Sequence, residues 1–189
     1  LPALARELGV AKLWVKDESK RFGLNAFKGL GGSWAIARWM GETLGLKGDK
    51  LTFPALTDPK VREKLGEVTF VTATDGNHGR GVAWAARELG CRAVVYLPKG
   101  SAQERLDNIL ALGAQAEITD LNYDDAVRLA TRKSEENGWV LIQDTAWPGY
   151  EQIPAWIMEG YTTLAGEIFD QLAEAGEEPP THLFLQAGV

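Results

Sequence analysis

The sequence predicts an α/β fold in which a doubly wound parallel sheet is covered by helices on both faces. Three observations indicate this class. Short apolar runs begin near residues 68, 91, 114 and 139, amphipathic helical patterns separate them, and glycine, proline or asparagine ends most segments. Because a helix that joins two neighbouring strands forms a right-handed crossover, the successive strands are expected to run parallel.

The first strand–helix unit occupies residues 68–90. Val68–Ala73 predicts a buried strand, and Thr74–Asn77 predicts a polar turn after it. A helix follows, because apolar residues recur there at helical spacing. These residues are Val82, Ala86 and Leu89. Gly90 stands where a helix ends in the left-handed conformation that favours glycine.

Two further units repeat the pattern. Cys91–Leu97 predicts a second strand, and the spacing of Ser101 and Glu104 predicts a capping box at the start of the next helix, which Gly113 ends. The third unit and the fourth strand follow without a break. They comprise a strand at Ala114–Thr119, a helix capped by Asn122 and closed by Asn137–Gly138, and a strand at Trp139–Gln143.

The flanking segments contain further elements. We expect a strand at Lys12–Asp17, a helix at Gly29–Gly45, a loop at residues 46–66 with a short helix at 58–65, a helix at about 154–175 and a strand at Thr181–Ala187. Since the last strand runs straight into Gly188-Val189, we expect the chain to be a fragment of a longer protein.

Composition narrows the class of partner. The net charge is −6, with 20 Lys+Arg against 26 Asp+Glu, which argues against nucleic acid or an anionic membrane as a partner. With one cysteine and two histidines, no metal site is expected. No apolar run approaches the roughly 20 residues that span a bilayer. These features predict a soluble, cytoplasmic protein.

The strongest candidate site is the turn Thr74-Asp75-Gly76-Asn77-His78-Gly79. It follows a predicted strand at the sheet edge where α/β proteins bind ligands, and its backbone amides begin a helix, which favours an anion. The alternative is an ordinary strand-to-helix turn capped by Asp or Asn. The glycine spacings of the dinucleotide folds and of the P-loop are absent.

Lys28 is the second candidate. It follows Asn25-Ala26-Phe27 and opens an apolar helix, where desolvation would suit an amine that forms an imine. The alternative is a surface lysine at a helix start. Asp144 is the third candidate, because it also lies at the carboxyl end of a predicted strand; its alternative role is a strand-end cap.

Together these segments resemble the fold-type II pyridoxal-phosphate-dependent enzymes, whose fold is like that of the tryptophan synthase β chain. Threonine dehydratase, serine racemase and cysteine synthase are members. Those relatives carry a Ser/Thr-Phe-Lys segment and a Ser-x-Gly-Asn-His-Gly segment; here Ala26 precedes Phe27, and Asp75 replaces a serine-like residue. Including Gln143-Asp144-Thr145-Ala146-Trp147, the match is closest to the members that act on 2,3-diaminopropionate.

The resemblance implies a role for each matching residue. Lys28 would bond covalently to the cofactor pyridoxal 5′-phosphate, Phe27 would pack against its ring, and Asn77 would hydrogen-bond its phenolic oxygen. Gly188 would open the loop that grips the phosphate. The backbone amides of the turn would hold the substrate carboxylate. Their residues are Thr74, Asp75, Gly76, Asn77 and His78.

The implied reaction is an α,β-elimination that converts 2,3-diaminopropionate into pyruvate and ammonia. Lys28 would take the Cα proton of the L-isomer and Asp75 that of the D-isomer, while Asp144 would orient the second ammonium or assist proton transfer. A serine/threonine dehydratase or racemase of the same fold is one alternative. A non-catalytic metabolite-binding domain is another.

The resemblance also implies a domain division and an assembly. Residues 1–28 would begin a large domain, residues 29–146 would form a small α/β domain, and residues 147–189 would begin the returning large domain. The family is typically homodimeric and serves amino-acid catabolism.

Overall fold

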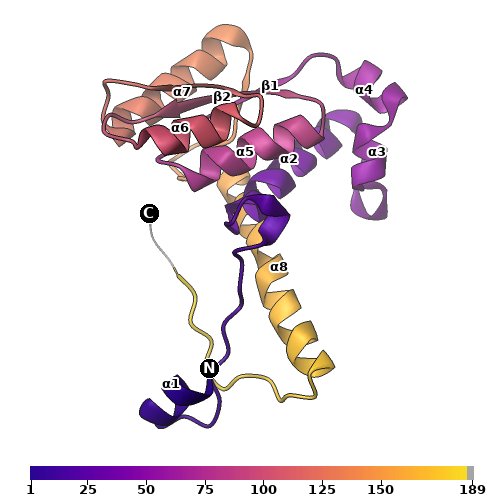
Figure 1. The fold of residues 1–189 in the computed structure, drawn as a ribbon. Helices are drawn as coiled ribbons and strands as arrows, with labels where there is room; N and C mark the ends of the chain where they lie inside the picture. Colours follow the sequence, from indigo (N-terminus) through magenta and orange to yellow (C-terminus); the bar gives the residue numbers. More distant parts are fainter. Residues whose placement is uncertain (187–189) are drawn as a thin grey trace. The chain divides into compact units, whose positions relative to one another are not determined.

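A computed structural model describes residues 1–186 of the chain, which form two units (Figure 1). One unit comprises Leu1–Asp17 with Thr162–Val189, and the other comprises Glu18–Tyr161. Gly188 lies outside the described residues. The predicted assignment of residues 1–28, 29–146 and 147–189 to the domains of a whole enzyme stays a prediction.

The larger unit contains a four-stranded parallel sheet, which confirms the predicted fold class. Its strands are β1 (Thr69–Ala73), β2 (Arg92–Leu97), β3 (Gln115–Ile118) and β4 (Val140–Leu141), in the order β3-β2-β1-β4. All three pairings are parallel. In register, Val71 of β1 lies between Val94 of β2 and Leu141 of β4.

Helices connect and cover these strands. They are α1 (Pro2–Glu7), α2 (Lys28–Leu44), α3 (Phe53–Thr57), α4 (Pro59–Leu65), α5 (Asn77–Glu88), α6 (Gln103–Leu110), α7 (Tyr123–Asn137) and α8 (Gln152–Glu174), with short 3₁₀ turns at Arg21–Gly23 and Gly48–Lys50. Among the described residues, no helix is both long enough and apolar enough to span a membrane.

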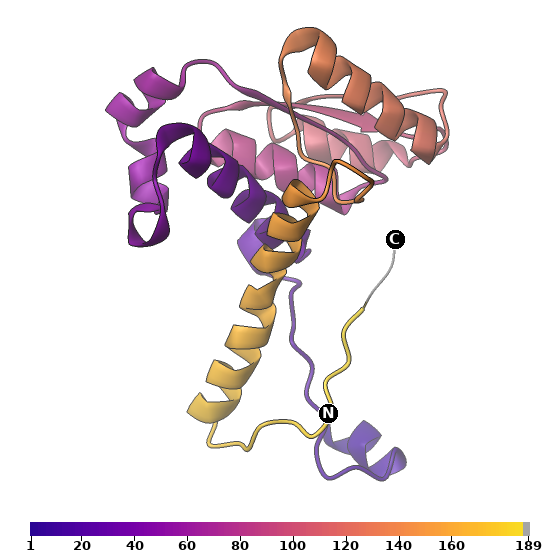
Figure 2. The ribbon, with the colours of Figure 1, turned by 180° about the vertical axis from the view of Figure 1, so that it is seen from behind.

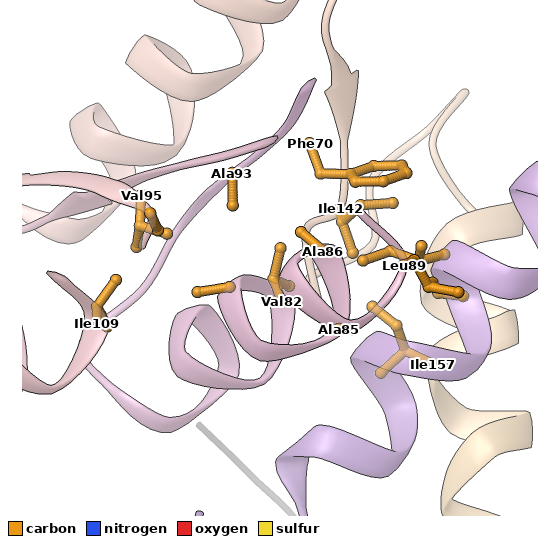
Figure 3. Packing of buried hydrophobic residues seen from close by; sticks show 14 of the residues in the cluster. Phe70, Val82, Ala85, Ala86, Leu89, Ala93, Val95, Ile109, Ile142 and Ile157 are labelled. Atoms are coloured by element: carbon orange, nitrogen blue, oxygen red, sulfur yellow. The ribbon is translucent and has the colours of Figure 1, made fainter. Parts of the chain in front are cut away.

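Each face of the sheet has its own hydrophobic core, because side chains alternate along a strand. Phe70 and Val95 point to the face covered by α2, α5 and α6, where Ile36, Val82 and Ile109 are fully buried (Figure 3). Val71 and Val94 point to the opposite face, where they pack with residues of α7. Figure 2 shows α7 on the far side of the sheet from α5. Helices on both faces make the sheet doubly wound.

Small residues bring α5 close to α2. A Cβ added at Gly81 would lie 3.1 Å from the carbonyl oxygen of Lys28 and 3.0 Å from the Cα of Gly29. Real Cβ atoms seldom make contacts that short, so this crossing requires glycine. The first residues of α2 and α5 are therefore held beside each other, at the carboxyl ends of the strands.

Most of the predicted helix ends are confirmed. Asn122 caps α7 by accepting a hydrogen bond from the amide of Asp125, and Gly138 ends that helix with φ +65°. Gly45 ends α2 in the left-handed conformation.

The capping box at Ser101 and Glu104 is wrong. Helix α6 begins at Gln103 with Ala102 before it and no side-chain cap in this described segment. The amide of Ser101 instead donates to the carbonyl of Pro98, which places Ser101 in the preceding turn.

Two predicted strands are also wrong for the described residues. Lys12–Asp17 and the described part of Thr181–Ala187 belong to no strand. A strand needs a partner for its backbone hydrogen bonds, and the described sheet contains none for these two segments.

Candidate functional site

The candidate site lies at the carboxyl ends of β1 and β4, beside the first turns of α2 and α5. Lys28 is the first residue of α2, and its Nζ donates a hydrogen bond to Oδ2 of Asp144 at 3.1 Å. The two residues are 116 positions apart in sequence. Asp144 stands just after β4, so the fold brings together two of the three residues predicted to be catalytic.

The Asp144 carboxyl is largely enclosed, with its side chain 13% exposed. Burial acts to raise the pKa of this carboxyl, but the charge of His78 where that ring is protonated, the charge of Lys28 and the hydrogen bond from Lys28 act to lower it, and the pKa lies below its ordinary value. Since a neutral histidine contributes no charge, the cation that keeps Asp144 ionised near pH 7 is Lys28.

Gln143 ties this edge of the sheet together. It is completely buried, and its Oε1 accepts hydrogen bonds from the amide of Ala73 at 3.0 Å and from the hydroxyl of Thr72 at 3.1 Å. Its Nε2 donates to the hydroxyl of Tyr123 at 3.1 Å and lies 3.4 Å from Oδ1 of Asp144. Gln143 therefore fixes the end of β4 to the end of β1 and orients the neighbouring carboxylate.

His78 lies beside Asp144 and is buried, with 3% of its side chain exposed. Its Nε2 lies 2.8 Å from the carbonyl oxygen of Ile142; because a carbonyl only accepts, Nε2 carries the proton. Its Nδ1 lies 3.8 Å from Oδ2 of Asp144 and has no hydrogen-bond partner among residues 1–186. Burial lowers the pKa of His78, against the opposing attraction of Asp144, so the ring is neutral near pH 7.

Tyr161 of α8 is a site residue that the sequence analysis missed. Its ring lies 5.9 Å from Nζ of Lys28 and meets the ring of Phe27 edge-on at 5.1 Å between centroids. Its hydroxyl is buried and has no partner in the described part of the chain. Burial, with a smaller effect of Asp144, raises the pKa of this phenol. The sequence gives no signal for it, because Tyr161 reads as one apolar position of a long helix.

The turn after β1 has the predicted form. Oγ1 of Thr74 accepts a hydrogen bond from the amide of Gly76 at 3.0 Å, and Asn77 begins α5 with an exposed side chain. Over the described residues no side chain caps α5. Amides in the first turn of a helix have no partner within it, so this turn offers donors and the positive end of the helix dipole.

Asp75 is placed differently from Asp144. Its side chain is 76% exposed and lies 3.7 Å from Nη1 of Arg105, which also donates to the Asp75 carbonyl. Among the contacts of the described chain, none joins Asp75 to Lys28. The structure therefore brings Lys28, Phe27, His78 and Asp144 together and leaves the Asp75 carboxylate at the surface.

The whole chain, residues 1–189, matches the family described as pyridoxal-phosphate dependent enzymes. It is 59% identical over 189 residues to the diaminopropionate ammonia-lyase of Salmonella typhimurium, covering 100% of this chain and 47% of that protein. The chain thus spans about half the length of the curated relatives it matches.

Solved structures agree with these matches. The crystal structure of Escherichia coli diaminopropionate ammonia lyase in apo form aligns with 100% of this chain and 50% of its own, at a TM-score of 0.91 and 56% identity. A structure of the same enzyme in complex with D-serine aligns over 95% of this chain and 45% of its own, with a TM-score of 0.87 and 56% identity.

Proposed function

Because the chain belongs to the family of pyridoxal-phosphate-dependent enzymes, we propose that it acts as an ammonia-lyase that converts 2,3-diaminopropionate into pyruvate and ammonia. The observation that carries the proposal is the hydrogen bond between Lys28 and Asp144 at the carboxyl ends of the strands. The relatives from Salmonella typhimurium and Escherichia coli supply the substrate class, because both are named as diaminopropionate ammonia-lyases.

The residues at the site fit pyridoxal phosphate. The cofactor's aldehyde requires a primary amine, and Lys28 offers one that is 28% exposed and held by a carboxylate. The buried hydroxyl of Tyr161, which has no partner among residues 1–186, supplies a polar group beside it. Phe27 would pack against the ring and Asn77 would bond its phenolic oxygen. Gly188 would begin the loop around the phosphate.

When bound, the cofactor provides the conjugated system that accepts the electron pair left by removal of the Cα proton. The chain's own residues would position the substrate. The amides of residues 74–78 would hold its carboxylate, as expected for an anion at a helix start. Asp144, ionised and enclosed, would attract the substrate's second ammonium.

Proton removal would involve two residues on opposite sides of the substrate. Lys28 would take the Cα proton of the L-isomer and Asp75 that of the D-isomer. Asp75 would first have to exchange its ion pair with Arg105 for the substrate. The complex of the Escherichia coli relative with D-serine supports a site that admits a D-amino acid.

The experiment is a product assay on the intact protein with added pyridoxal phosphate. We expect pyruvate from 2,3-diaminopropionate at a far higher kcat/KM than from serine, and Lys28→Ala should abolish both turnover and the visible absorption band that the cofactor shows only when it is bonded to the lysine. Faster turnover of serine would favour a dehydratase. No turnover with an absorption band that survives Lys28→Ala would contradict both the activity and the role of Lys28.

We propose further that the enzyme works in the cytoplasm as a homodimer in amino-acid catabolism, and that its small and large domains divide near residues 28 and 146. The resemblance to the family supports these points. Sedimentation equilibrium of the intact protein tests the dimer, because a monomer at micromolar concentration would contradict it.

A further inference from the structure

Beside Asp144 lies an acceptor atom, Nδ1 of His78, to which the proposed reaction gives no role. The carbonyl of Ile142 fixes the His78 tautomer, so Nδ1 presents a lone pair. That lone pair faces Oδ2 of Asp144 at 3.8 Å. Two acceptors with no proton between them repel each other, which accounts for the long distance and for the absence of a partner for Nδ1 in the described chain.

The arrangement changes when Lys28 no longer supplies a cation. Oδ2 of Asp144 accepts from Nζ of Lys28, and an uncompensated carboxylate in so enclosed a place is costly. If one proton enters the pair, it can lie between Oδ2 and Nδ1. Shortening the separation by about 1 Å then gives a charge-assisted hydrogen bond of ordinary length.

We propose that His78 is a positioning residue that holds Asp144 by sharing one proton with it when Lys28 is withdrawn from the carboxylate and no substrate ammonium has taken its place. The inference rests on the proposed function, in which Lys28 leaves Asp144 to bond to the cofactor. The pair gains one proton from solvent. The proton is bound to Oδ2 or to Nδ1, and no bond between heavy atoms forms or breaks.

The charged and polar groups that face His78 are few. Asp144 approaches Nδ1 from the end of β4, Lys28 acts from the start of α2, and the carbonyl of Ile142 holds Nε2. Asp144 raises the pKa of His78 and Lys28 lowers it, although burial is the largest influence and lowers it overall. Loss of the Lys28 charge therefore favours protonation of the pair.

The test is ¹⁵N NMR of the histidine rings in the intact, cofactor-free protein, with His78→Gln used to identify the His78 signals. Lys28→Met should raise the pH midpoint of the His78 titration by about 1 pH unit or more, since it removes the neighbouring cation. Lys28→Arg is the matched control, because it keeps the charge, and its midpoint should stay at that of the unsubstituted protein.

The double variant Lys28→Met/Asp144→Asn distinguishes two explanations of a raised midpoint. One is a proton shared between His78 and Asp144, and the other is loss of the repulsion between the Lys28 charge and a protonated His78. We expect the rise to disappear when the carboxylate is gone. An equal rise in the double variant, or no rise in Lys28→Met, overturns the proposal. None of these measurements uses turnover, so failure of the ammonia-lyase assay and failure of this inference are distinguishable.

Enzyme kinetics gives a second test of His78. If His78 had only a structural role, its substitution would not change the pH profile of kcat. His78→Gln keeps a side-chain donor for the Ile142 carbonyl but removes the acceptor beside Asp144. In the intact enzyme it should lower kcat by about 10-fold or more and move the pH profile of kcat, with KM little changed. An unchanged pH profile overturns the proposal.

Discussion

Asp75 and Asp144 follow neighbouring strands, yet the Asp75 side chain is exposed and the Asp144 side chain is largely buried. The sequence places both at one sheet edge, because each follows the carboxyl end of a strand of a parallel sheet. It does not reveal that Gln143 and Lys28 hold Asp144 inward while Arg105 holds Asp75 outward. That outcome depends on residues brought in from other parts of the chain. For the same reason the site role of His78 beside Asp144 could not be read from its position in a turn.

Substitution of Asp75 tests its assignment as the second base. Asp75→Asn should lower kcat/KM for D-2,3-diaminopropionate by about 100-fold while the L-isomer loses far less, because only the D-isomer presents its Cα proton to that side. Pyruvate release from each isomer is the measurement. Equal losses on both isomers would rule out the two-base arrangement.

The pH dependence of stability reports on His78. Its pKa lies below the ordinary value of 6.5, so between those two pH values the unfolded chain binds a proton that the folded chain does not. The free energy of unfolding therefore rises with pH in that window, by at most about 1.4 kcal/mol per pH unit, and the gain is complete above pH 6.5.

Urea denaturation at a series of pH values checks this expectation. The slope should be smaller in His78→Gln and unchanged in His182→Gln, since His182 is exposed. A slope that His78→Gln leaves intact would assign the effect to other groups.

At the scale of elements, periodicity and glycines predicted all four strands of the sheet and the main helices to within a few residues. Asn122 was recognisable as a cap because it directly precedes the helix, and its side chain accepts a hydrogen bond from the amide of Asp125, three residues further on. Ser101 with Glu104 has a similar signature, but the turn at Pro98 delays the helix until Gln103. Local pattern therefore specifies the elements, while competing turns move their first residues.

Two glycines of α8 give a matched test of helix packing. A Cβ at Gly160 would lie 2.6 Å from the carbonyl oxygen of Leu30, whereas nothing in the described part of the chain lies within 4 Å of a Cβ at Gly166. Gly160→Ala should lower the free energy of unfolding by about 1–3 kcal/mol through overpacking. Gly166→Ala should raise it by about 0.5–1 kcal/mol, because alanine favours a helix. Denaturant unfolding compares them, and similar effects would refute the close contact of α8 with α2.

At the scale of the whole molecule, the fold class was predictable because each crossover is local in sequence. The strands expected at Lys12–Asp17 and Thr181–Ala187 were not, because pairing depends on whether a neighbouring strand exists. Apolar content predicts that a segment can form a strand. Whether it does so depends on whether the three-dimensional structure places another strand beside it.

Hydrogen exchange distinguishes amides of paired strands from amides of segments that belong to no described strand. Amides of Thr69–Ala73 should be strongly protected, because every residue of that strand is buried and paired with β2, and Phe70 and Val71 are also paired with β4. Amides of residues 12–15 and 183–186 should exchange rapidly, since these segments belong to no described strand. Strong protection there would show that they pair after all.

The strand order β3-β2-β1-β4 has a consequence for how this molecule can change over evolutionary time. The strands that follow β1 in the chain are added first on one side of it, as β2 and β3, and then on the other side, as β4, so the strand order reverses between β1 and β4. In parallel α/β sheets ligands bind at such a point, whichever side chains line it. Residues that maintain the sheet lie inside the strands, and residues that choose a ligand lie just past their ends. New specificity can therefore be acquired by exchange of a few rim residues while the scaffold is inherited intact.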